Sequence, residues 1–309
     1  MSLPIGLDIA KLKIDFYSNS SHCVIANDEK SIKKHFKKLD RTSPIVMEAT
    51  GKYHRTAHRT LEEMGFDVMV VNPYQSKHFA KAMNLRCKTD KVDAKMLSIY
   101  AERMEFKKSP CMEQGEQKRL DLLRHLDDLK KIRIDINARA RESSDFIEKS
   151  LKRTLMTIDL EIKKTEAKLL SAVRSDDATK RNFELLLTIP GIGDPTAISL
   201  LCLLRELGQA SKREIASLSG LAPMNFDSGT KRGRRMIQGG RHDVRRHLYM
   251  PIVGAATKHN PRLKEFYTRL IASGKPGKVA LTACMRKLIV WANAMLATGL
   301  PWNENVEKN

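Results

Sequence analysis

Four acidic residues have the type and placement needed for divalent-metal chemistry: Asp8, Glu48, Asp90 and Asp93. Asp8 lies in IGLDIA, an apolar segment with the pattern of a strand, and Glu48 ends a second such segment, PIVME. Open α/β sheets bind ligands at strand ends, so two acids on neighbouring strands could face one site. Asp90 and Asp93 are three residues apart at the start of a predicted helix, which puts both carboxylates on one face.

Converging carboxylates of this kind suit phosphodiester transfer. Hard cations such as Mg²⁺ and Mn²⁺ take oxygen ligands, and two Mg²⁺ ions can neutralise charge on a pentacovalent phosphate and activate its nucleophile. Each acid alone has a structural explanation, since Asp90, for example, could simply cap its helix. Two strand-borne acids and a helical pair in one basic chain are harder to explain that way. We therefore predict that these four residues are metal ligands and catalytic.

The elements that must position these acids follow the apolar pattern of the first third. Short apolar runs predict strands at 5–10, 11–18, 21–27, 44–48 and 67–72, and amphipathic patterns predict helices at 31–39 and 53–65. Strands that alternate with helices imply an α/β layer with a partly parallel sheet. Because the antiparallel strands come first, a mixed sheet fits better than a dinucleotide-binding fold.

The rest of the chain is predicted to be mainly helical. Residues 116–173 contain no proline or glycine and carry apolar residues at coiled-coil spacing, so we expect an antiparallel or intermolecular coiled coil, or helices that pack on their neighbours. The last third opens with a helix, a Gly-rich turn and a helix, and further helices begin near Val244, Pro261 and Gly277. The predicted boundaries are 1–112, 113–182 for the helical spacer, 183–303, and 304–309 for a polar tail.

Charge points to a polyanionic partner. The 309 residues include 56 Lys and Arg against 36 Asp and Glu, a net charge of +20. By region the balance is +7 over 1–110, +2 over 111–188 and +11 over 189–309. The last third therefore favours nucleic acid over a membrane surface, since no amphipathic helix with an aromatic and leucine face stands out. No apolar run of bilayer-spanning length and no cleavable leader are recognisable, so the cytoplasm is the expected compartment.

The cysteines and histidines suggest no further metal site at this level. Five scattered cysteines with no CxxC indicate neither a disulfide framework nor a zinc site. His54 and His58 are four apart and could share a helix face as ligands, but no third ligand of matching spacing accompanies them.

Several long motifs resemble a known family. GLDIAK, MEATGKY and VVNPYQSKHFAKAMNLRCKTDKVDAKML are similar to the RuvC-like domain of the DEDD transposases of insertion sequences, relatives of the Piv-type DNA invertases. TIPGIGDPTA, SLSGLAP, DSGTKRGRRMIQGGRHDVRRHLYMP and GKPGKVALTACMRKL resemble the C-terminal transposase domain of the same family. The two blocks cover most of the chain.

The resemblance implies specific roles. It implies an RNase H-like (RuvC-like) fold for the first domain, with Asp8, Glu48, Asp90 and Asp93 as ligands of Mg²⁺. It also implies that Ser228, in the second domain, attacks a DNA phosphate and becomes a covalent phosphoserine. An RNA encoded by the element would then choose the donor and target DNA. Basic residues follow Ser228 at once and could activate its hydroxyl or bind the phosphate, although DSGT could also be only a turn.

A set of glycine and basic residues is predicted to contact nucleic acid. TIPGIGDPTA resembles a helix-hairpin-helix, whose turn glycines expose backbone N–H groups to a phosphate. The candidate residues are Gly191, Gly193, Lys231, Arg232, Arg234, Arg235, Arg245, Arg246, Lys275 and Lys278, with Arg286 and Lys287 extending the basic surface.

Three functions are compatible with these features. The first is a recombinase of an insertion element that uses the acids and Ser228 and acts as a homodimer or higher homo-oligomer. The second is a RuvC-type structure-specific nuclease in which metal-activated water is the nucleophile. The third is a nucleic-acid-binding protein without catalytic activity. Ser228 discriminates the first from the second, and the acids discriminate both from the third.

Overall fold

The computed structural model describes residues 3–85, 89–225, 227, 229, 233 and 235–303. The chain divides into two compact units, Met1–Glu113 and Gln114–Asn309, which are treated separately below. The four-part division drawn from the sequence stays a prediction.

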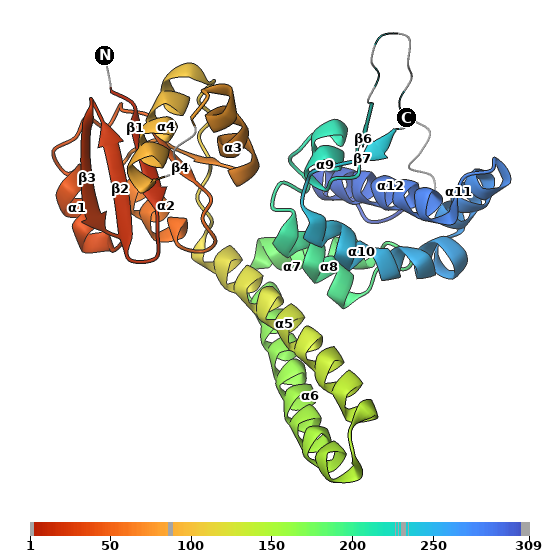
Figure 1. Ribbon diagram of the computed structural model, residues 1–309. Coiled ribbons are helices and arrows are strands. Elements are labelled where there is room, and N and C mark those ends of the chain that lie inside the picture. Colours follow the sequence, from red (N-terminus) through yellow and green to blue (C-terminus); the bar gives the residue numbers. More distant parts are fainter. Residues whose placement is uncertain are drawn as a thin grey trace. The chain divides into compact units, whose positions relative to one another are not determined.

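A five-stranded mixed sheet forms the centre of the first unit (Figure 1). Its elements are β1 (Ile5–Ile9), β2 (Lys13–Ser18), β3 (Ser21–Ala26), α1 (Glu29–Phe36), β4 (Ile45–Glu48), α2 (His54–Glu63), β5 (Val68–Val71), α3 (Pro73–Ala82) and α4 (Asp90–Arg103). The strand order is β3-β2-β1-β4-β5: the first three strands are antiparallel, and β4 and β5 run parallel to β1. This arrangement confirms the predicted mixed sheet and its RNase H-like order.

Side-chain alternation gives the sheet two packed faces. Ile5, Leu7 and Ile9 point into a core shared with α1 and α2, whereas Val46 and Val71 pack against α4 on the opposite face. Successive residues of a strand face opposite sides, so the positions between the first-face residues, Gly6 and Asp8, turn toward α4. The period-2 pattern thus decides which strand residues can meet that helix.

The second unit is mainly helical, as predicted. It contains α5 (Gln114–Glu142), α6 (Asp145–Arg174), α7 (Asp177–Leu187), α8 (Asp194–Leu203), α9 (Lys212–Leu218), β6 (Pro223–Met224), β7 (Met236–Ile237), α10 (His242–Gly254), the π-helix η1 (Ala255–His259), α11 (Pro261–Ala272) and α12 (Gly277–Thr298). The paired two-residue strands β6 and β7 and the π-helix were not predicted.

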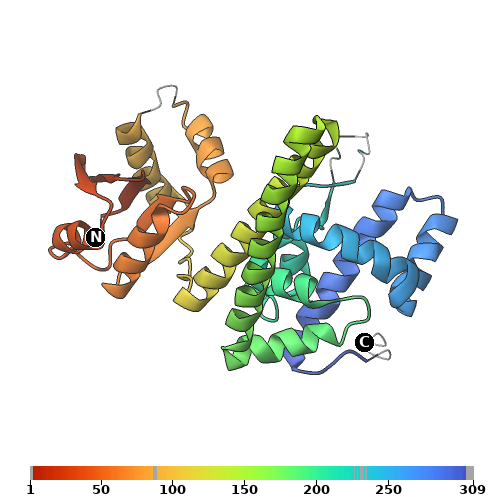
Figure 2. The same cartoon turned by 90° about the horizontal axis from the view of Figure 1, so that it is seen from below.

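The long helices α5 and α6 form an antiparallel hairpin within one chain, joined by two residues, Ser143 and Ser144 (Figures 1 and 2). Leu126 and Ile162 are buried at the predicted coiled-coil positions. Lys130 pairs with Glu166 at 2.8 Å across the hairpin. The coiled coil is therefore intramolecular in at least this pairing.

Helix α12 departs from one sequence expectation. It is long and apolar enough, by length and composition alone, to cross a membrane, so the expectation that no run approaches that length is wrong. A core helix passes the same test, and α12 buries Cys284, Leu288 and Ile289 completely in the core of the second unit. Its place in that core explains the apolar composition.

Candidate active site

Close packing of α4 on β1 brings three of the predicted acids together. A Cβ on Gly6 would lie 2.0 Å from the carbonyl oxygen of Ala94 and 2.3 Å from the backbone N of Ser98. Only glycine permits that approach of helix backbone to strand backbone. Asp8 follows Gly6 on the same face, and Asp90 and Asp93 occupy the first turn of α4.

Glu48 joins them from the neighbouring strand. β4 pairs with β1 in parallel with Leu7 opposite Met47, so Asp8 and Glu48 hold the next positions on adjacent strands. The Ser76 hydroxyl of α3 donates a hydrogen bond of 2.6 Å to Oε2 of Glu48. Ser76 is only 1% exposed, so this bond fixes the Glu48 carboxylate from within the protein.

The first turn of α4 has an N-cap hydrogen bond and an ion pair with β2. The Thr89 hydroxyl accepts a hydrogen bond from the Val92 backbone N, so Thr89, rather than Asp90, is the N-cap. The Asp90 carboxylate instead accepts a 2.6 Å hydrogen bond from Lys13 Nζ of β2. That hydrogen bond, and then the charge of Lys13, lower the pKa of Asp90.

The pKa of Asp8 responds to burial and to the other acids. The pKa of Asp8 is raised from its ordinary 3.8 to about 6, chiefly by burial and then by the charges of Asp93, Asp90, Asp15 and Glu48, in that order of importance. Carboxylates that repel one another in this way favour a bound cation or a proton. The oxygen donor set fits a hard divalent ion, which would be held by Asp8, Glu48, Asp90 and Asp93.

A fifth carboxylate borders this site and was missed from the sequence. Asp15 of β2 lies directly opposite Asp8 in the antiparallel register and is 4% exposed. It contacts Lys13 Nζ at 3.1 Å and His22 Nε2 at 2.9 Å, so protein groups already occupy its carboxylate oxygens. Asp15 could have been found from the sequence through its place in β2, because strand alternation puts it on the same face of the sheet as Asp8.

The predicted nucleophile belongs to the second unit. Ser228, Lys231, Arg232 and Arg234 lie outside the described residues. In the described residues on either side of this segment, β6 pairs with β7. Asp227 Oδ1 accepts a 3.0 Å hydrogen bond from the Gly233 backbone N, which ties two points of this segment to each other.

The two glycines of the TIPGIGDPTA turn have different surroundings. Gly191 has φ +91° and packs against η1, where an added Cβ would lie 2.7 Å from Ala255 Cβ. Gly191 is therefore required for packing, whatever else it contacts. Gly193 is exposed and is the N-cap of α8, so its end of the helix is accessible to an anion.

The remaining predicted basic residues fall into two groups. Arg245 Nη1 donates to the carbonyl oxygens of Ser219, Gly220 and Gly239, and Arg246 pairs with Asp127 at 2.8 Å. These two arginines thus also hold the second unit together.

The second group of basic residues lines a cavity. A cavity of about 650 Å³ is lined by apolar side chains, among them Phe266 and Trp291, and also by Arg235 and Lys278. Arg286 and Lys287 line it as well, so the structure brings four of the basic side chains named from the sequence to one place. Lys275 is exposed nearby in the chain, just before α12.

Comparison with known proteins agrees with the two blocks of motifs. Residues 5–156 match the family of DEDD transposases of IS110 elements, described as "Transposase". Residues 183–268 match the family described as "Transposase IS116/IS110/IS902 family". The chain is also 27% identical over 323 residues to the pilin gene-inverting proteins of Moraxella lacunata and Moraxella bovis, with 98% of each chain covered. A DEDD domain implies a divalent metal. The protein is therefore a member of the IS110 family of transposases, enzymes that cleave and transfer DNA strands.

Proposed function

We propose that this transposase uses its acidic cluster and Ser228 as two halves of one catalytic centre. The observation that supports the first half is geometric: Asp8 and Glu48 hold the next positions after a residue pair on adjacent parallel strands, and Asp90 and Asp93 lie in the first turn of the helix that packs on Gly6. These acids would hold Mg²⁺, or Mn²⁺ in its place, which when bound supplies Lewis-acid stabilisation of charge on the phosphate.

The second half is a covalent step at Ser228. Its Oγ would attack the phosphorus of the scissile phosphodiester while the bond from phosphorus to the leaving strand oxygen breaks. The serine proton is lost to a base, and the leaving oxygen takes up a proton. The bond between Ser228 and the DNA is itself a phosphodiester, so a strand can be rejoined from it without a separate hydrolysis step. Support comes from the family match over residues 183–268 and from the basic residues beside Ser228.

Substrate binding is proposed to use the basic surface of the second unit. Arg235, Lys278, Arg286 and Lys287 line one cavity, where they could neutralise backbone phosphates. The relatives are named for inverting a pilin gene, so inversion of a DNA segment is one outcome open to this chemistry, alongside movement of an insertion element. We also propose that part of the +11 charge over residues 189–309 binds a structured RNA that selects the DNA sites.

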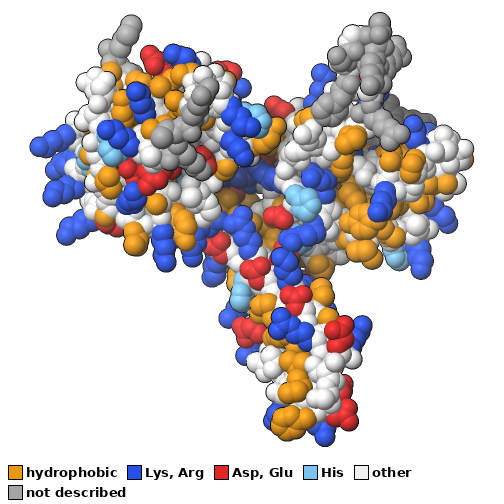
Figure 3. Space-filling model, in the orientation of Figure 1, with side chains coloured by type: hydrophobic (Ala, Val, Ile, Leu, Met, Phe, Trp, Pro, Cys, Tyr) orange, Lys and Arg blue, Asp and Glu red, His pale blue; other side chains and the backbone are white. Residues whose placement is uncertain are grey.

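Oligomer formation is proposed to use the far half of the α5–α6 hairpin. Phe146 is 84% exposed and Met156 is 73% exposed, and hydrophobic side chains gather toward the free end of the hairpin in Figure 3. Exposed apolar residues on a coiled coil indicate a partner helix. A homodimer would let the acidic cluster of one chain act with Ser228 of either chain.

Ser228 separates this mechanism from hydrolysis by a RuvC-type nuclease. We expect Ser228→Ala to abolish strand cleavage on element-end DNA, tested with Mg²⁺ and with co-expressed RNA from the flanks of the element. The unaltered protein should form a covalent protein–DNA adduct that denaturing gels detect. Full-rate cleavage by Ser228→Ala would establish water as the nucleophile instead. Asp93→Asn should lose cleavage while DNA and RNA binding is largely retained.

A further inference from the structure

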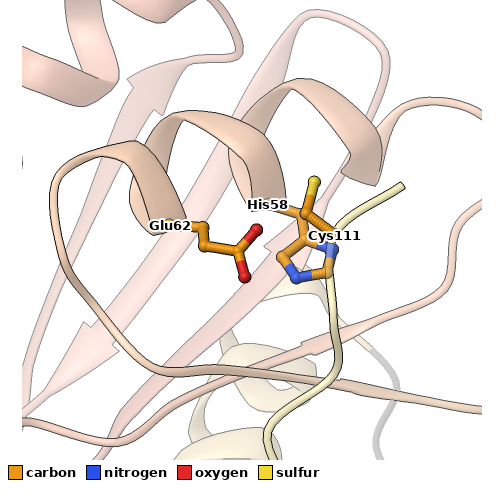
Figure 4. A group of neighbouring side chains, drawn as sticks. All are labelled: His58, Glu62 and Cys111. Atoms are coloured by element: carbon orange, nitrogen blue, oxygen red, sulfur yellow. The ribbon is translucent and has the colours of Figure 1, made fainter. Parts of the chain in front are cut away.

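Figure 4 shows a second group of side chains that could hold a metal ion, none of which belongs to the acidic cluster. Ligand atoms of His58, Glu62 and Cys111 all lie within 4.8 Å of one another. His58 and Glu62 are one turn apart on α2, so they project from the same side of the helix. The sequence pairs His58 with His54, one turn earlier. The structure instead supplies Glu62 one turn later and a cysteine that no spacing motif could connect to it.

Backbone contacts deliver Cys111 to this place. The segment 104–113 leaves α4 and runs beside β5, where the Ser109 backbone N donates to the Val68 carbonyl at 2.8 Å. The Ser109 hydroxyl accepts from the Val70 backbone N at 2.9 Å. Ser109 is thereby fixed to the edge of the sheet, and Cys111 follows two residues later.

A backbone carbonyl fixes the orientation of the His58 ring. Its Nε2 lies 2.9 Å from the Ser109 carbonyl oxygen, and because a carbonyl can only accept, Nε2 carries the proton. The lone pair of the neutral ring is then on Nδ1. Metal-binding histidines characteristically donate their other N–H to a backbone carbonyl or carboxylate in this way. His58 is 7% exposed, so the ring is held within the protein.

The donor set distinguishes this group from the acidic cluster. Imidazole nitrogen, thiolate sulfur and carboxylate oxygen together suit Zn²⁺, whereas Mg²⁺ prefers oxygen ligands alone. Because cysteine binds metal as the thiolate, uptake of the ion should release the Cys111 thiol proton to solvent.

We propose that His58, Glu62 and Cys111 form a Zn²⁺ site, with a fourth position open to water, that fastens segment 104–113 to α2. This segment joins the two units of the chain, so the ion would fix the point at which the polypeptide leaves the first unit. The site is separate from the proposed catalytic centre and does not depend on it. The ion would hold segment 104–113, which joins the two units, against α2. Occupancy of the site would depend on zinc supply and on oxidation of Cys111.

Cobalt provides the test, because a thiolate ligand gives Co²⁺ a charge-transfer band that oxygen ligands do not. We expect chelator-stripped, full-length protein to bind one equivalent of Co²⁺ with this band in excess Mg²⁺. One equivalent of Zn²⁺ should abolish the band. Cys111→Ser should lose it, and Glu62→Gln should weaken Co²⁺ binding by about tenfold or more.

Matched variants keep the result unambiguous. Cys23→Ser removes another part-buried thiol, one that lies 3.6 Å from His35 Nε2, and should retain the band. Asp8→Asn should also retain it, since the acidic cluster is a different site. Zn²⁺ should slow proteolysis within 104–113 in the unaltered protein and leave Cys111→Ser unaffected. Absence of the band in the unaltered protein, or its survival in Cys111→Ser, would overturn the proposal. If Cys111→Ser fails to fold, unweakened Co²⁺ binding by Glu62→Gln overturns it equally.

Discussion

At the residue scale, Asp8 is held in a position that favours its neutral form. Its pKa is raised from 3.8 to about 6, so the folded protein binds more protons than the unfolded chain between these values. The contribution of Asp8 to stability is therefore most favourable below about pH 4 and is lost as the pH rises through about 6. A bound cation would reverse this cost at neutral pH.

Replacing Asp8 should raise the stability of the metal-free protein and abolish its activity. We expect Asp8→Asn to stabilise the metal-free protein at pH 7 by about 1 kcal/mol, after allowance for solvent screening, while abolishing strand cleavage. Urea denaturation with a chelator at pH 7 and pH 5 measures the effect, and the gain should shrink at pH 5. A variant less stable than the parent at pH 7 would show that burial and like-charge repulsion do not destabilise the ionised Asp8 carboxylate.

Ser76 is expected to act through Glu48. Ser76→Ala removes the 2.6 Å hydrogen bond to a buried side of the Glu48 carboxylate, so we expect Mg²⁺ to bind about tenfold to a hundredfold more weakly. Cleavage rate against Mg²⁺ concentration measures this, and saturating Mg²⁺ should restore part of the rate. Ser98→Ala is the matched control, since that buried serine donates to the Pro4 carbonyl instead. Equal losses in both variants would refute a specific role for Ser76.

At the scale of elements, the register of β1 and α4 depends on Gly6. Gly6→Ala would drive a methyl group into the backbone of α4, at 2.0 Å from the Ala94 carbonyl oxygen. We expect a loss of about 3 kcal/mol in unfolding free energy, measured in urea, and loss of cleavage as α4 moves from Asp8. Gly115→Ala, at the start of α5, has only the end of the Arg119 side chain nearby and should cost nothing. Full stability of Gly6→Ala would mean that α4 can shift freely.

Sequence pattern predicted the strands and most helices because each has a strongly apolar face. Asp8 and Glu48 could be placed because each belongs to such a strand. Helix α3 was missed: Ser76 is its one buried residue, and Asn72–Pro73 was interpreted only as the end of β5. Ser76, Asp15 and Cys111 were missed as site residues because their partners are distant along the chain or lie on another strand. Local periodicity carries no information on such contacts.

At the scale of the whole molecule, assembly should depend on the hairpin tip. We expect the double variant Phe146→Ser and Met156→Ser to halve the solution mass measured by light scattering, because the apolar contact between hairpins is lost. Folding of each chain should be unaffected, since both side chains are largely exposed. A parent protein that is already monomeric, or a variant that remains dimeric, would place the interface elsewhere.

The hairpin also has a geometric consequence. Its helices contain 29 and 30 residues and reverse direction over two, so the chain returns close to where it set out, after an excursion of about 43 Å. Matched deletions of whole heptads from both helices would shorten this arm without disturbing the chain at its base. In the homodimer proposed above, the number of paired turns in the two helices would set the length of each arm between its base and the point where two chains meet.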